Sequence, residues 1–380
     1  MLRQRNKAII HTDTGLSYVE SFSRFLPSLK RRKKALLSYL TGPVIAELQN
    51  EELVRFSNHG LAVSWARVLN ELGYIVDIID WDNTEFVPKK KYDLIVFHGG
   101  KNFEQIMHNV KNQPRIIHWL TGSYWKFNNS EEDKRLADFK KRHGTTIARD
   151  RYIIDSEELV NETSDMIIVL GDPSMRSVYP SKYKKVFTVN NASYPDNHYD
   201  THPKDYVSAK ENFLFFAGSG SIHKGLDLLI DSFKDLTQHL YIVANTDRAV
   251  MNVFKKELQL PNIHLIGEVG MRTKEFYDVM GTCAYVILPS CSEGQAGSVV
   301  EAMNQGLIPI VSKETRLDAT GYGYVLKNNT IAEITSAVKH FSSLTPAKVH
   351  SMSREVRLVT QAYHSPEFFR KQLKAILKKL

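Results

Sequence analysis

Short apolar runs recur along the first half of the chain, and most of them end at glycine or another turn residue. A run of four to eight apolar residues bounded by turn residues is typical of a buried strand. Residues 61–72 have apolar positions at helical spacing and stop at Gly73, which predicts a helix. Strand, helix and strand in this order predict a parallel sheet. The predicted strands are 35–40, 74–79, 93–97, 115–120, 166–170 and 186–189.

The same pattern starts again in the second half of the chain. A glycine-rich loop at 218–225 follows an apolar run, and 226–236 predict a helix. Two halves of this kind predict an α/β protein with two Rossmann-like domains, in which ligands bind at the carboxyl ends of the strands. The predicted strands of this half are 213–217, 241–244, 263–266 and 284–288.

Other segments connect or flank the two halves. Residues 1–33 carry scattered apolar residues without a clear period, so we expect an extension. A long connection spans 41–59, a strongly charged stretch at 130–141 predicts an exposed helix, and polar turn residues up to Lys204 suit a linker. Ser365-Pro366 is a good start for a last helix. The predicted organisation is an extension at 1–33, an N-terminal domain at 34–204, a C-terminal domain at 205–363 and a final helix at 364–380.

Composition indicates a soluble globular protein. The 380 residues are 42% hydrophobic and 24% charged, and no run of about 18 apolar residues predicts a membrane-spanning helix. The first residues lack the apolar core of a secretory signal. Cys283 and Cys291 are the two cysteines, which suits a reducing cytoplasm and excludes a disulfide framework. We therefore expect a cytoplasmic protein, and we interpret Cys291 as a small packing residue and not as a nucleophile.

The positive charge is concentrated at the start of the chain. The net charge is +8, and residues 1–34 hold nine basic and two acidic residues, 9 − 2 = +7. The basic cluster at 30–34 follows apolar residues, a mixture that favours an anionic membrane surface over nucleic acid. A solvated edge before the first strand is an equal interpretation, so peripheral membrane contact stays one of two hypotheses.

Residues 289–303 carry the clearest candidate chemistry. A buried strand precedes them, a loop with two glycines follows, and a helix begins near Gly297-Ser298. The first N–H groups of a helix and its dipole form an anion site. Glu293 in the loop and Glu301 one turn into the helix flank that site. Because a carboxylate accepts two hydrogen bonds and a vicinal diol offers two, the pattern predicts a ligand that is part phosphate and part sugar.

The glycine-rich loop is a second candidate phosphate site. Its glycines let the backbone approach a diphosphate closely, and Lys224 supplies a positive charge. By itself a Gly-Ser-Gly with a lysine is a weak signal, but together with the later stretch it predicts two elements around one diphosphate.

Glu293 and Glu301, with seven residues between them, resemble the Glu-x(7)-Glu motif of retaining GT-B glycosyltransferases, in particular glycosyltransferase family 4 (group 1). The surrounding sequences Leu-Pro-Ser, Ser-Glu-Gly and Glu-Ala-Met match as well.

The glycine-rich loop is similar to the family's Gly-Arg-Leu-x(3)-Lys-Gly motif at Gly218, Lys224 and Gly225. Ser219 stands where the family has arginine, so a bidentate phosphate clamp is lost unless His223 or another arginine replaces it.

The resemblance implies a GT-B fold, in which two Rossmann-like domains with parallel sheets face a central cleft and the last helix crosses back to the first domain. It implies Glu293, Lys224 and His118 as catalytic residues. On the donor side it implies Gly218, Ser219, Lys224, Glu268, Val269, Gly294, Gly297, Ser298, Val299 and Glu301. On the acceptor side we expect Gly42, His98 and Thr121.

The first half resembles the family more loosely. Asp93 to Gly99 is similar to the family's Asp-x(4)-His-Gly strand end, and His118 with Thr121-Gly122 is similar to the next strand end. Either histidine also suits a purely structural role at the end of a strand. The Asp-x-Asp at 80–82 follows the second strand, where we expect a solvated turn, and no His/Cys cluster has metal-ligand spacing. No cofactor and no metal are therefore predicted.

The resulting hypothesis is a retaining hexosyltransferase that moves a sugar from a nucleotide diphosphate sugar to an acceptor hydroxyl. A lipid-linked or growing saccharide of a bacterial surface polysaccharide is the expected acceptor, and a small soluble acceptor is the alternative. A dinucleotide oxidoreductase would need Gly-x-Gly-x-x-Gly, and the third glycine is absent after Gly218-Ser219-Gly220. A non-catalytic binding protein is the remaining rival.

Overall fold

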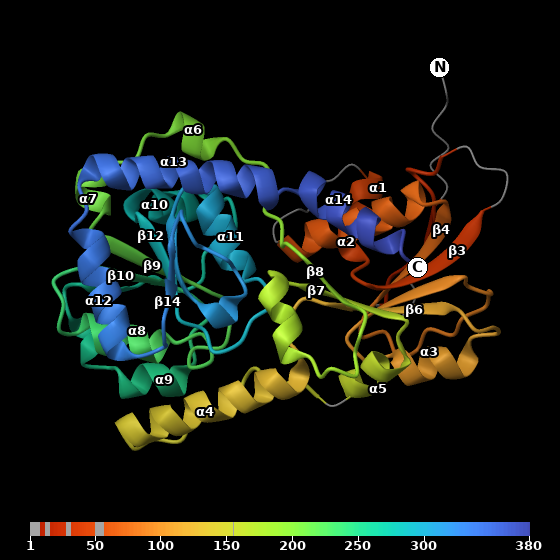
Figure 1. The fold of residues 1–380 in the computed structure, drawn as a ribbon, viewed down its shortest axis with the longest axis horizontal. Coiled ribbons are helices and arrows are strands. Elements are labelled where there is room, and N and C mark those ends of the chain that lie inside the picture. Colours follow the sequence, from red (N-terminus) through yellow and green to blue (C-terminus); the bar gives the residue numbers. More distant parts are fainter. Residues whose placement is uncertain (1–7, 12–15, 28–31, 50–56, 155) are drawn as a thin grey trace. The chain divides into compact units, whose positions relative to one another are not determined.

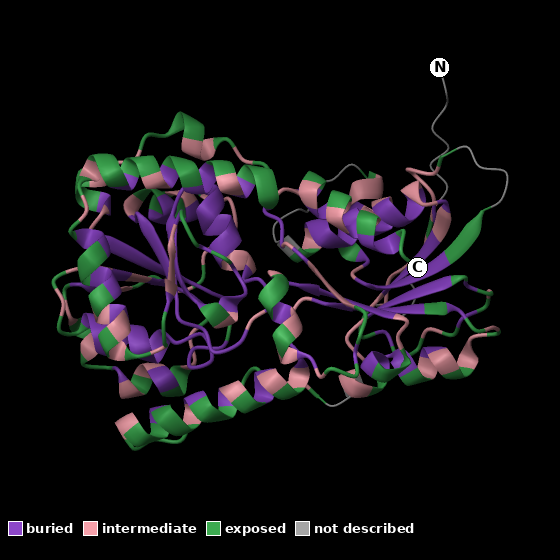
Figure 2. Cartoon of the chain, viewed as in Figure 1, coloured by how far each residue is buried: buried purple, intermediate pink, exposed green. Residues whose placement is uncertain are grey.

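The computed structural model describes residues 8–11, 16–27, 32–49, 57–154 and 156–380 (Figure 1). The chain forms two compact units. Unit 1 consists of residues 1–121, 154–194 and 366–380, and unit 2 consists of residues 122–153 and 195–365. In both units the strands are buried and the outward faces of the helices are exposed (Figure 2).

Unit 1 is built on an eight-stranded sheet with the order β1-β2-β4-β3-β5-β6-β7-β8. The six strands from β4 to β8 pair in parallel, as the apolar runs predict, and β2 pairs antiparallel with β4. The strands are β1 (Ile9–His11), β2 (Tyr18–Phe22), β3 (Lys33–Tyr39), β4 (Tyr74–Asp80), β5 (Leu94–His98), β6 (Arg115–Leu120), β7 (Met166–Leu170) and β8 (Val186–Val189).

Side chains bury both faces of this sheet, because neighbouring residues of a strand point to opposite faces. Leu37 and Val96 belong to the core beneath α2 and α14, whereas Leu36 and Ile95 belong to the core on the other face, which Phe103 of α3 joins. The helices of unit 1 are α1 (Gly42–Gln49), α2 (Ser57–Glu71), α3 (Phe103–Asn109), α5 (Ser156–Thr163) and α14 (Pro366–Leu377), with a 3₁₀ helix at Pro173–Val178.

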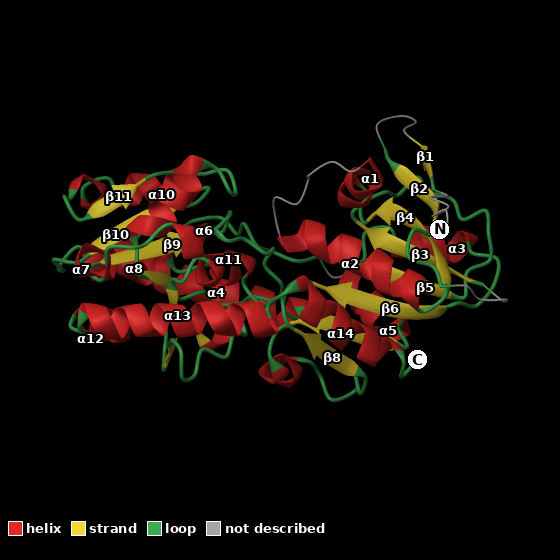
Figure 3. Ribbon diagram, turned by 90° about the horizontal axis from the view of Figure 1, so that it is seen from above, coloured by secondary structure: helices red, strands yellow, loops and turns green. Residues whose placement is uncertain are grey.

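Part of the predicted extension at 1–33 belongs to the sheet. β1 and β2 form an antiparallel pair beyond β4, at the edge seen in Figure 3. The alternation in this segment is broken at Ser21, which has a positive φ of 60°, where the register shifts. The Asp77 carboxylate accepts a 2.9 Å hydrogen bond from the Ser21 backbone and fixes this irregularity. Lys30 and Arg31 of the basic cluster lie outside the described residues.

The predicted connection at 41–59 contains the helix α1, and α2 begins at Ser57, four residues earlier than predicted. Residues 50–56 lie outside the described part of the chain. Trp81 and Asp82 form an exposed turn, as predicted, whereas the carboxylate of Asp80 accepts hydrogen bonds from the backbone and hydroxyl of Thr41, at 2.9 and 2.6 Å. Asp80 thereby holds the start of α1 at the carboxyl end of β3.

Unit 2 is built on a six-stranded, fully parallel sheet with the order β11-β10-β9-β12-β13-β14. The chain first runs outward from β9 to β11, then returns to place β12 beside β9 and runs outward in the other direction. The strands are β9 (Asn212–Phe216), β10 (His239–Val243), β11 (Ile263–Leu265), β12 (Tyr285–Leu288), β13 (Ile308–Ser312) and β14 (Tyr324–Leu326).

Helices cover both faces of this sheet, with α10, α11 and α13 on one face and α8 and α12 on the other (Figure 1). Residues of all six strands contribute to or pack against one large core. The helices of unit 2 are α4 (Trp125–His143), α6 (His198–Thr201), α7 (Tyr206–Ala209), α8 (Leu226–Phe233), α9 (Arg248–Val253), α10 (Lys274–Thr282), α11 (Gly297–Asn304), α12 (Ile331–Ser342) and α13 (Pro346–Tyr363).

The charged helix α4 has an exposed face, as predicted, but it belongs to unit 2 and not to the N-terminal domain. Arg142 forms ion pairs with Asp227 and Asp231 of α8, and Phe139 is fully buried in the core of unit 2. Arg135 is buried as well, and its Nη2 donates a 3.0 Å hydrogen bond to the backbone oxygen of Pro289. The helix α4 thus attaches to unit 2 through one face, while charged residues of its other face, such as Asp133, Lys134 and Lys140, are exposed.

The boundary before unit 2 also differs from the predicted linker up to Lys204. The Asp196 carboxylate accepts hydrogen bonds from the Tyr277 hydroxyl at 2.6 Å and from Gln305 at 3.1 Å. Residues from Pro195 onward therefore belong to unit 2. At the other end of unit 2, the chain returns to unit 1 after Ser365, and α14 packs there on α2 and β8. Within the described residues, no helix has the combined length and apolar character that crossing a membrane requires.

Candidate functional site

The order of strands in unit 2 places two loops at a topological switch point. β9 and β12 are neighbours, with Phe213 opposite Tyr285, and the chain leaves them toward opposite sides of the sheet. In open parallel sheets, ligands bind in the crevice beyond the carboxyl ends of strands at such a point. The loop at 218–225 follows β9 and the loop at 289–296 follows β12, so both candidate motifs lie there.

The glycine-rich loop is shaped by two residues with positive φ, Gly220 at 102° and Gly225 at 80°. A Cβ at Gly225 would lie 2.6 Å from the backbone oxygen of Pro289 and 2.9 Å from Nη1 of Arg135. Glycine is therefore required at 225 for both its conformation and its close packing. The turn is closed by hydrogen bonds from the Lys224 backbone to the oxygen of Gly220, at 2.8 Å, and from Gly225 to Ile222, at 3.0 Å.

Lys224 and Glu293 form an ion pair that joins the two loops. Their side chains are only 10% and 11% exposed, and the Ser290 hydroxyl donates a 3.0 Å hydrogen bond to the same carboxylate. Burial acts to raise the pKa of Glu293, but nearby positive charge, above all that of Lys224, outweighs burial and lowers the pKa. Glu293 is consequently ionised at neutral pH and is held beside a cation.

His223 is a neutral link between the loops. Its Nε2 donates a 2.6 Å hydrogen bond to the backbone oxygen of Ser292, and its own backbone oxygen accepts from Cys291 at 2.9 Å. Burial lowers the pKa of His223 to about 4. His223 therefore carries no charge at neutral pH and does not replace the arginine that is absent at Ser219. Burial raises the pKa of the Cys291 thiol to about 12, in keeping with its interpretation as a packing residue.

The helix α11 provides the second half of the site. The first helical hydrogen bond is donated by Val300 to Ala296, so the amides of Gly297, Ser298 and Val299 precede the helical ladder. Glu301 lies one turn into α11 and is buried, and its Oε2 is 4.0 Å from Nη2 of Arg272.

The remaining donor-side residues lie on the same edge of the sheet. Gly218 and Ser219 are exposed, Gly294 is buried, and Glu268 and Val269 follow the outermost strand β11. Because all strands of unit 2 are parallel, the loops after β9, β11 and β12 emerge at one edge. The structure brings Lys224 into contact with Glu293. Glu268 and Val269 follow β11, which β10 separates from β9 in the sheet.

The acceptor-side candidates lie in unit 1 at the carboxyl ends of adjacent strands β3, β5 and β6. Gly42 begins α1, His98 ends β5 and Thr121 follows β6. His98 Nδ1 donates a 3.0 Å hydrogen bond to the backbone oxygen of Trp119, and the ring lies 4.7 Å from that of Tyr39. Burial lowers the pKa of His98 to about 4, so this ring is neutral at physiological pH.

His118 occupies the interior of β6 and not its end. Its side chain is fully buried, and Nδ1 donates a 2.8 Å hydrogen bond to Oδ1 of Asn161 on α5. Burial lowers the pKa of His118 to about 3. These contacts give His118 a structural role in unit 1, and its catalytic role stays a prediction. Among the residues that the structure describes, no group of three or more His, Cys, Asp and Glu side chains forms a candidate metal site.

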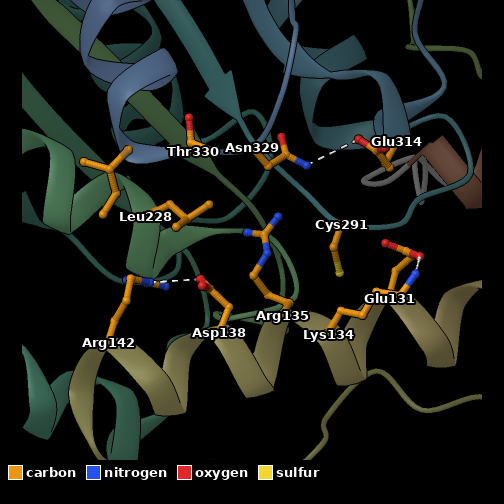
Figure 4. A pocket seen from close by; sticks show the side chains of 11 residues that line it. Glu131, Lys134, Arg135, Asp138, Arg142, Leu228, Cys291, Glu314, Asn329 and Thr330 are labelled. Carbon is orange, nitrogen blue, oxygen red and sulfur yellow. Dashed lines mark hydrogen bonds and ion pairs between the residues drawn. The ribbon is translucent and has the colours of Figure 1, made fainter.

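Sequence reasoning missed the contribution of α4 and the segment after it. Figure 4 shows a pocket of about 390 Å³ along α4, with Arg135 pointing toward the residues on the opposite wall, which include Cys291 and Asn329. Arg151, eight residues after the end of α4, packs against Gly220 of the glycine-rich loop. No local motif marks either arginine, because each lies at least 69 residues before its partner in the chain.

Known proteins resemble this chain most clearly in unit 2. Residues 211–343 match the family described as Glycosyl transferases group 1. This segment of unit 2 is thus similar to group 1 glycosyltransferases. Another protein of this kind, the uncharacterized glycosyltransferase YqgM of Bacillus subtilis (strain 168), is 25% identical over 167 residues, 43% of this chain and 46% of YqgM. The match thus spans less than half of that relative's length.

Solved structures of similar fold cover nearly the whole of this chain. Sucrose-phosphate synthase from Thermosynechococcus elongatus has a TM-score of 0.60 at 16% identity and covers 92% of this chain and 99% of its own. HepE from Anabaena, in complex with UDP and glucose, has a TM-score of 0.56 at 12% identity and covers 92% and 100%. The predicted fold class, two Rossmann-like domains of the GT-B type, is confirmed at the level of each unit.

Proposed function

We propose that this protein transfers a sugar from a nucleotide diphosphate sugar to an acceptor hydroxyl, with retention of the anomeric configuration. The observation that carries the proposal is the Lys224–Glu293 pair at the switch point of unit 2, with Glu293 in the loop that leads into α11 and its buried Glu301. This arrangement offers positive charge and free amides to phosphate, and it offers carboxylates to sugar hydroxyls. The family match to residues 211–343 supports the same assignment.

Each group has a distinct task in the proposed reaction. Lys224 and the amides of Gly297 and Ser298 stabilise the diphosphate as the bond to the sugar breaks. Glu301 accepts hydrogen bonds from the ribose hydroxyls, and Glu293 accepts them from the donor sugar. The acceptor oxygen bonds to the anomeric carbon on the face that the diphosphate leaves, and its proton passes to the departing phosphate oxygen.

The Lys224–Glu293 pair bears directly on donor binding. In the ligand-free protein each charge is balanced by the other in a site with little solvent. A bound diphosphate offers Lys224 a second anionic partner, which frees one oxygen of Glu293 for a sugar hydroxyl. The pair therefore holds both groups in position before the donor arrives.

The finer assignments rest on the resemblance and on unit 1. We propose that Gly42, His98 and Thr121 contact the acceptor, since they lie at adjacent strand ends. A lipid-linked or growing saccharide of a surface polysaccharide is the proposed acceptor, and a small soluble saccharide is the alternative. The basic residues near the start of the chain support peripheral contact with an anionic membrane.

The first test is thermal stabilisation of the protein by UDP, GDP, ADP and their sugars. A nucleotide at about 100 times its dissociation constant should stabilise the protein by roughly 2.7 kcal/mol. The stabilisation should disappear in Glu301→Gln and persist in Glu257→Gln, a matched change outside the site. Absence of any shift in the wild-type protein would contradict the proposal and favour a non-catalytic binding protein.

A second measurement addresses the chemistry. The wild-type protein should release nucleoside diphosphate from the donor that binds, and Glu293→Gln should slow this release. The anomeric configuration of the product, followed by proton NMR before mutarotation, should equal that of the donor. Inversion at the anomeric carbon would refute the retaining mechanism and leave the transfer activity in place.

A further inference from the structure

The glycine-rich loop carries little positive charge for a diphosphate. Ser219 is uncharged, His223 is neutral, and Lys224 is already paired with Glu293. Each phosphate of a diphosphate ester carries a negative charge, and such groups are bound most strongly by charge-assisted hydrogen bonds. A second cation is therefore expected at this loop, and it must come from another part of unit 2.

Arg151 is an exposed cation at this loop, whereas Arg135 beside Gly225 is buried and donates to the Pro289 oxygen. A Cβ at Gly220 would be 2.9 Å from Cγ and 3.0 Å from Cδ of Arg151, so the arginine stem covers the backbone of the loop at Gly220. The residue is exposed, and within the described residues its guanidinium makes no hydrogen bond or ion pair. After burial and Lys224, the charge of Arg151 is among the causes that set the pKa of Glu293, which shows that its field reaches the site.

The backbone around Arg151 is fixed rather than loosely placed. The buried carboxylate of Glu132 accepts hydrogen bonds from the amides of Asp150, at 3.1 Å, and Arg151, at 2.9 Å. The Asn128 side chain donates a 2.8 Å hydrogen bond to the oxygen of Arg151. All of these partners belong to α4, which the ion pairs of Arg142 and the buried Phe139 attach to unit 2. The stem of Arg151 is thus held in place while its guanidinium stays accessible.

The geometry points to Arg151 as a ligand of the donor diphosphate, supplied by the segment after α4 in place of an arginine at position 219. This inference rests on the proposed function, since it assigns a residue to the donor site of unit 2. Gly220 is part of the same arrangement, because a side chain at 220 would displace the stem of Arg151. The planar guanidinium can bind two phosphate oxygens at once, which a lysine cannot do.

The test compares Arg151→Met with Arg149→Met. Arg149 lies on the same segment, has the same charge and pairs with Asp133 at the surface, so its loss is the matched control. Affinities for UDP, GDP, ADP and the corresponding nucleosides are measured by calorimetry, at low and at physiological salt. Arg151→Met should weaken binding of the preferred nucleoside diphosphate roughly 10- to 100-fold, with little change for the nucleoside. Arg149→Met should bind both as the wild type does.

Arg151→Lys and chemical rescue separate a binding role from a structural one. Arg151→Lys should recover part of the lost affinity, and added guanidinium should partly restore diphosphate binding to Arg151→Ala. Equal affinity of Arg151→Met and wild type for the diphosphate, with Glu301→Gln still deficient, would overturn the role of Arg151 and leave the proposed function standing. Failure of the wild-type protein to bind any nucleoside diphosphate would overturn both. Equal losses for diphosphate and nucleoside would also overturn the inference.

Discussion

Removing Lys224 tests the central ion pair of the site in the absence of any ligand. Lys224→Met leaves the carboxylate of Glu293 nearly buried, with the Ser290 hydroxyl as its remaining hydrogen-bond donor among side chains. Breaking a buried ion pair by removing one partner costs about 3–5 kcal/mol. Because both side chains keep about a tenth of their surface exposed, we expect the lower end of this range.

The expected loss of stability depends on pH in a defined direction. In the wild type the pKa of Glu293 is lowered, so the stabilisation it provides is complete above its unfolded pKa of about 4.3. In Lys224→Met, burial is no longer outweighed, and the pKa of Glu293 should rise above that value. The variant then gains stability as pH falls through the raised pKa. The difference between variant and wild type should therefore be large at pH 7.5 and smaller at pH 5.5.

The assay is the thermal unfolding of the ligand-free protein at these two pH values. A loss of about 3 kcal/mol lowers the melting temperature of a unit of this size by roughly 6–12 °C. The double variant Lys224→Met/Glu293→Gln should recover part of the loss, since it leaves no unpaired buried charge. Lys274→Met, at an exposed pair with Asp278, is the control and should change little. A Lys224→Met protein that melts like the wild type, or whose deficit is the same at both pH values, would refute this account.

Two further predictions follow from backbone geometry and burial. Gly225→Ala should destabilise unit 2 and abolish nucleotide binding, because its Cβ would lie 2.6 Å from the Pro289 oxygen and its φ is 80°. Gly218→Ala has open space around its Cβ and should fold normally, and thermal unfolding checks both variants. His118→Gln should reduce the loss of unfolding free energy of unit 1 at acid pH. The pKa of His118 is about 6.5 in the unfolded chain and about 3 in the folded protein, so protonation favours unfolding as pH falls below 6.5. In the wild type this effect amounts to about 2 kcal/mol at pH 5.

Each of these has a clear contrary result. If Gly225→Ala and Gly218→Ala melt at the same temperature, the close approach of Pro289 and Arg135 to Gly225 does not limit this position. If His118→Gln loses stability between pH 6.5 and pH 5 as steeply as the wild type, the acid sensitivity of unit 1 arises elsewhere, with His98 as the next residue to replace.

Local patterns were sufficient for much of unit 2. The apolar runs predict β9 and β12, the strand before Glu293. The spacing of Glu293 and Glu301 predicts the loop and helix that follow. These features depend on residues close together in sequence, where periodicity and turn chemistry decide the structure. The contact between Lys224 and Glu293 follows once both loops are placed at neighbouring strand ends.

Long-range partners account for most of what the sequence could not predict. The charge of α4 suggests a solvated helix until Asp227 and Asp231 are known to face Arg142. The strand β2 depends on its pairing with β4 and on the Asp77 carboxylate that accepts from Ser21. His118 resembles a residue at a strand end, but pairing with β5 and β7 places it inside the sheet. Such contacts join residues at least 21 positions apart, beyond any local pattern.

The chain passes between its two units four times, after Thr121, Ile153, Tyr194 and Ser365. During synthesis from the N-terminus, every segment of unit 2 has therefore been made before α14, the last segment of unit 1. Phe369 and Leu373 of α14 are buried in the core of unit 1, so that core is completed only after all of unit 2 has been made. A nascent chain interrupted after Ser365 would leave the apolar surface of α2 uncovered, and it would be a substrate for chaperones and proteases although every segment of unit 2 has been made.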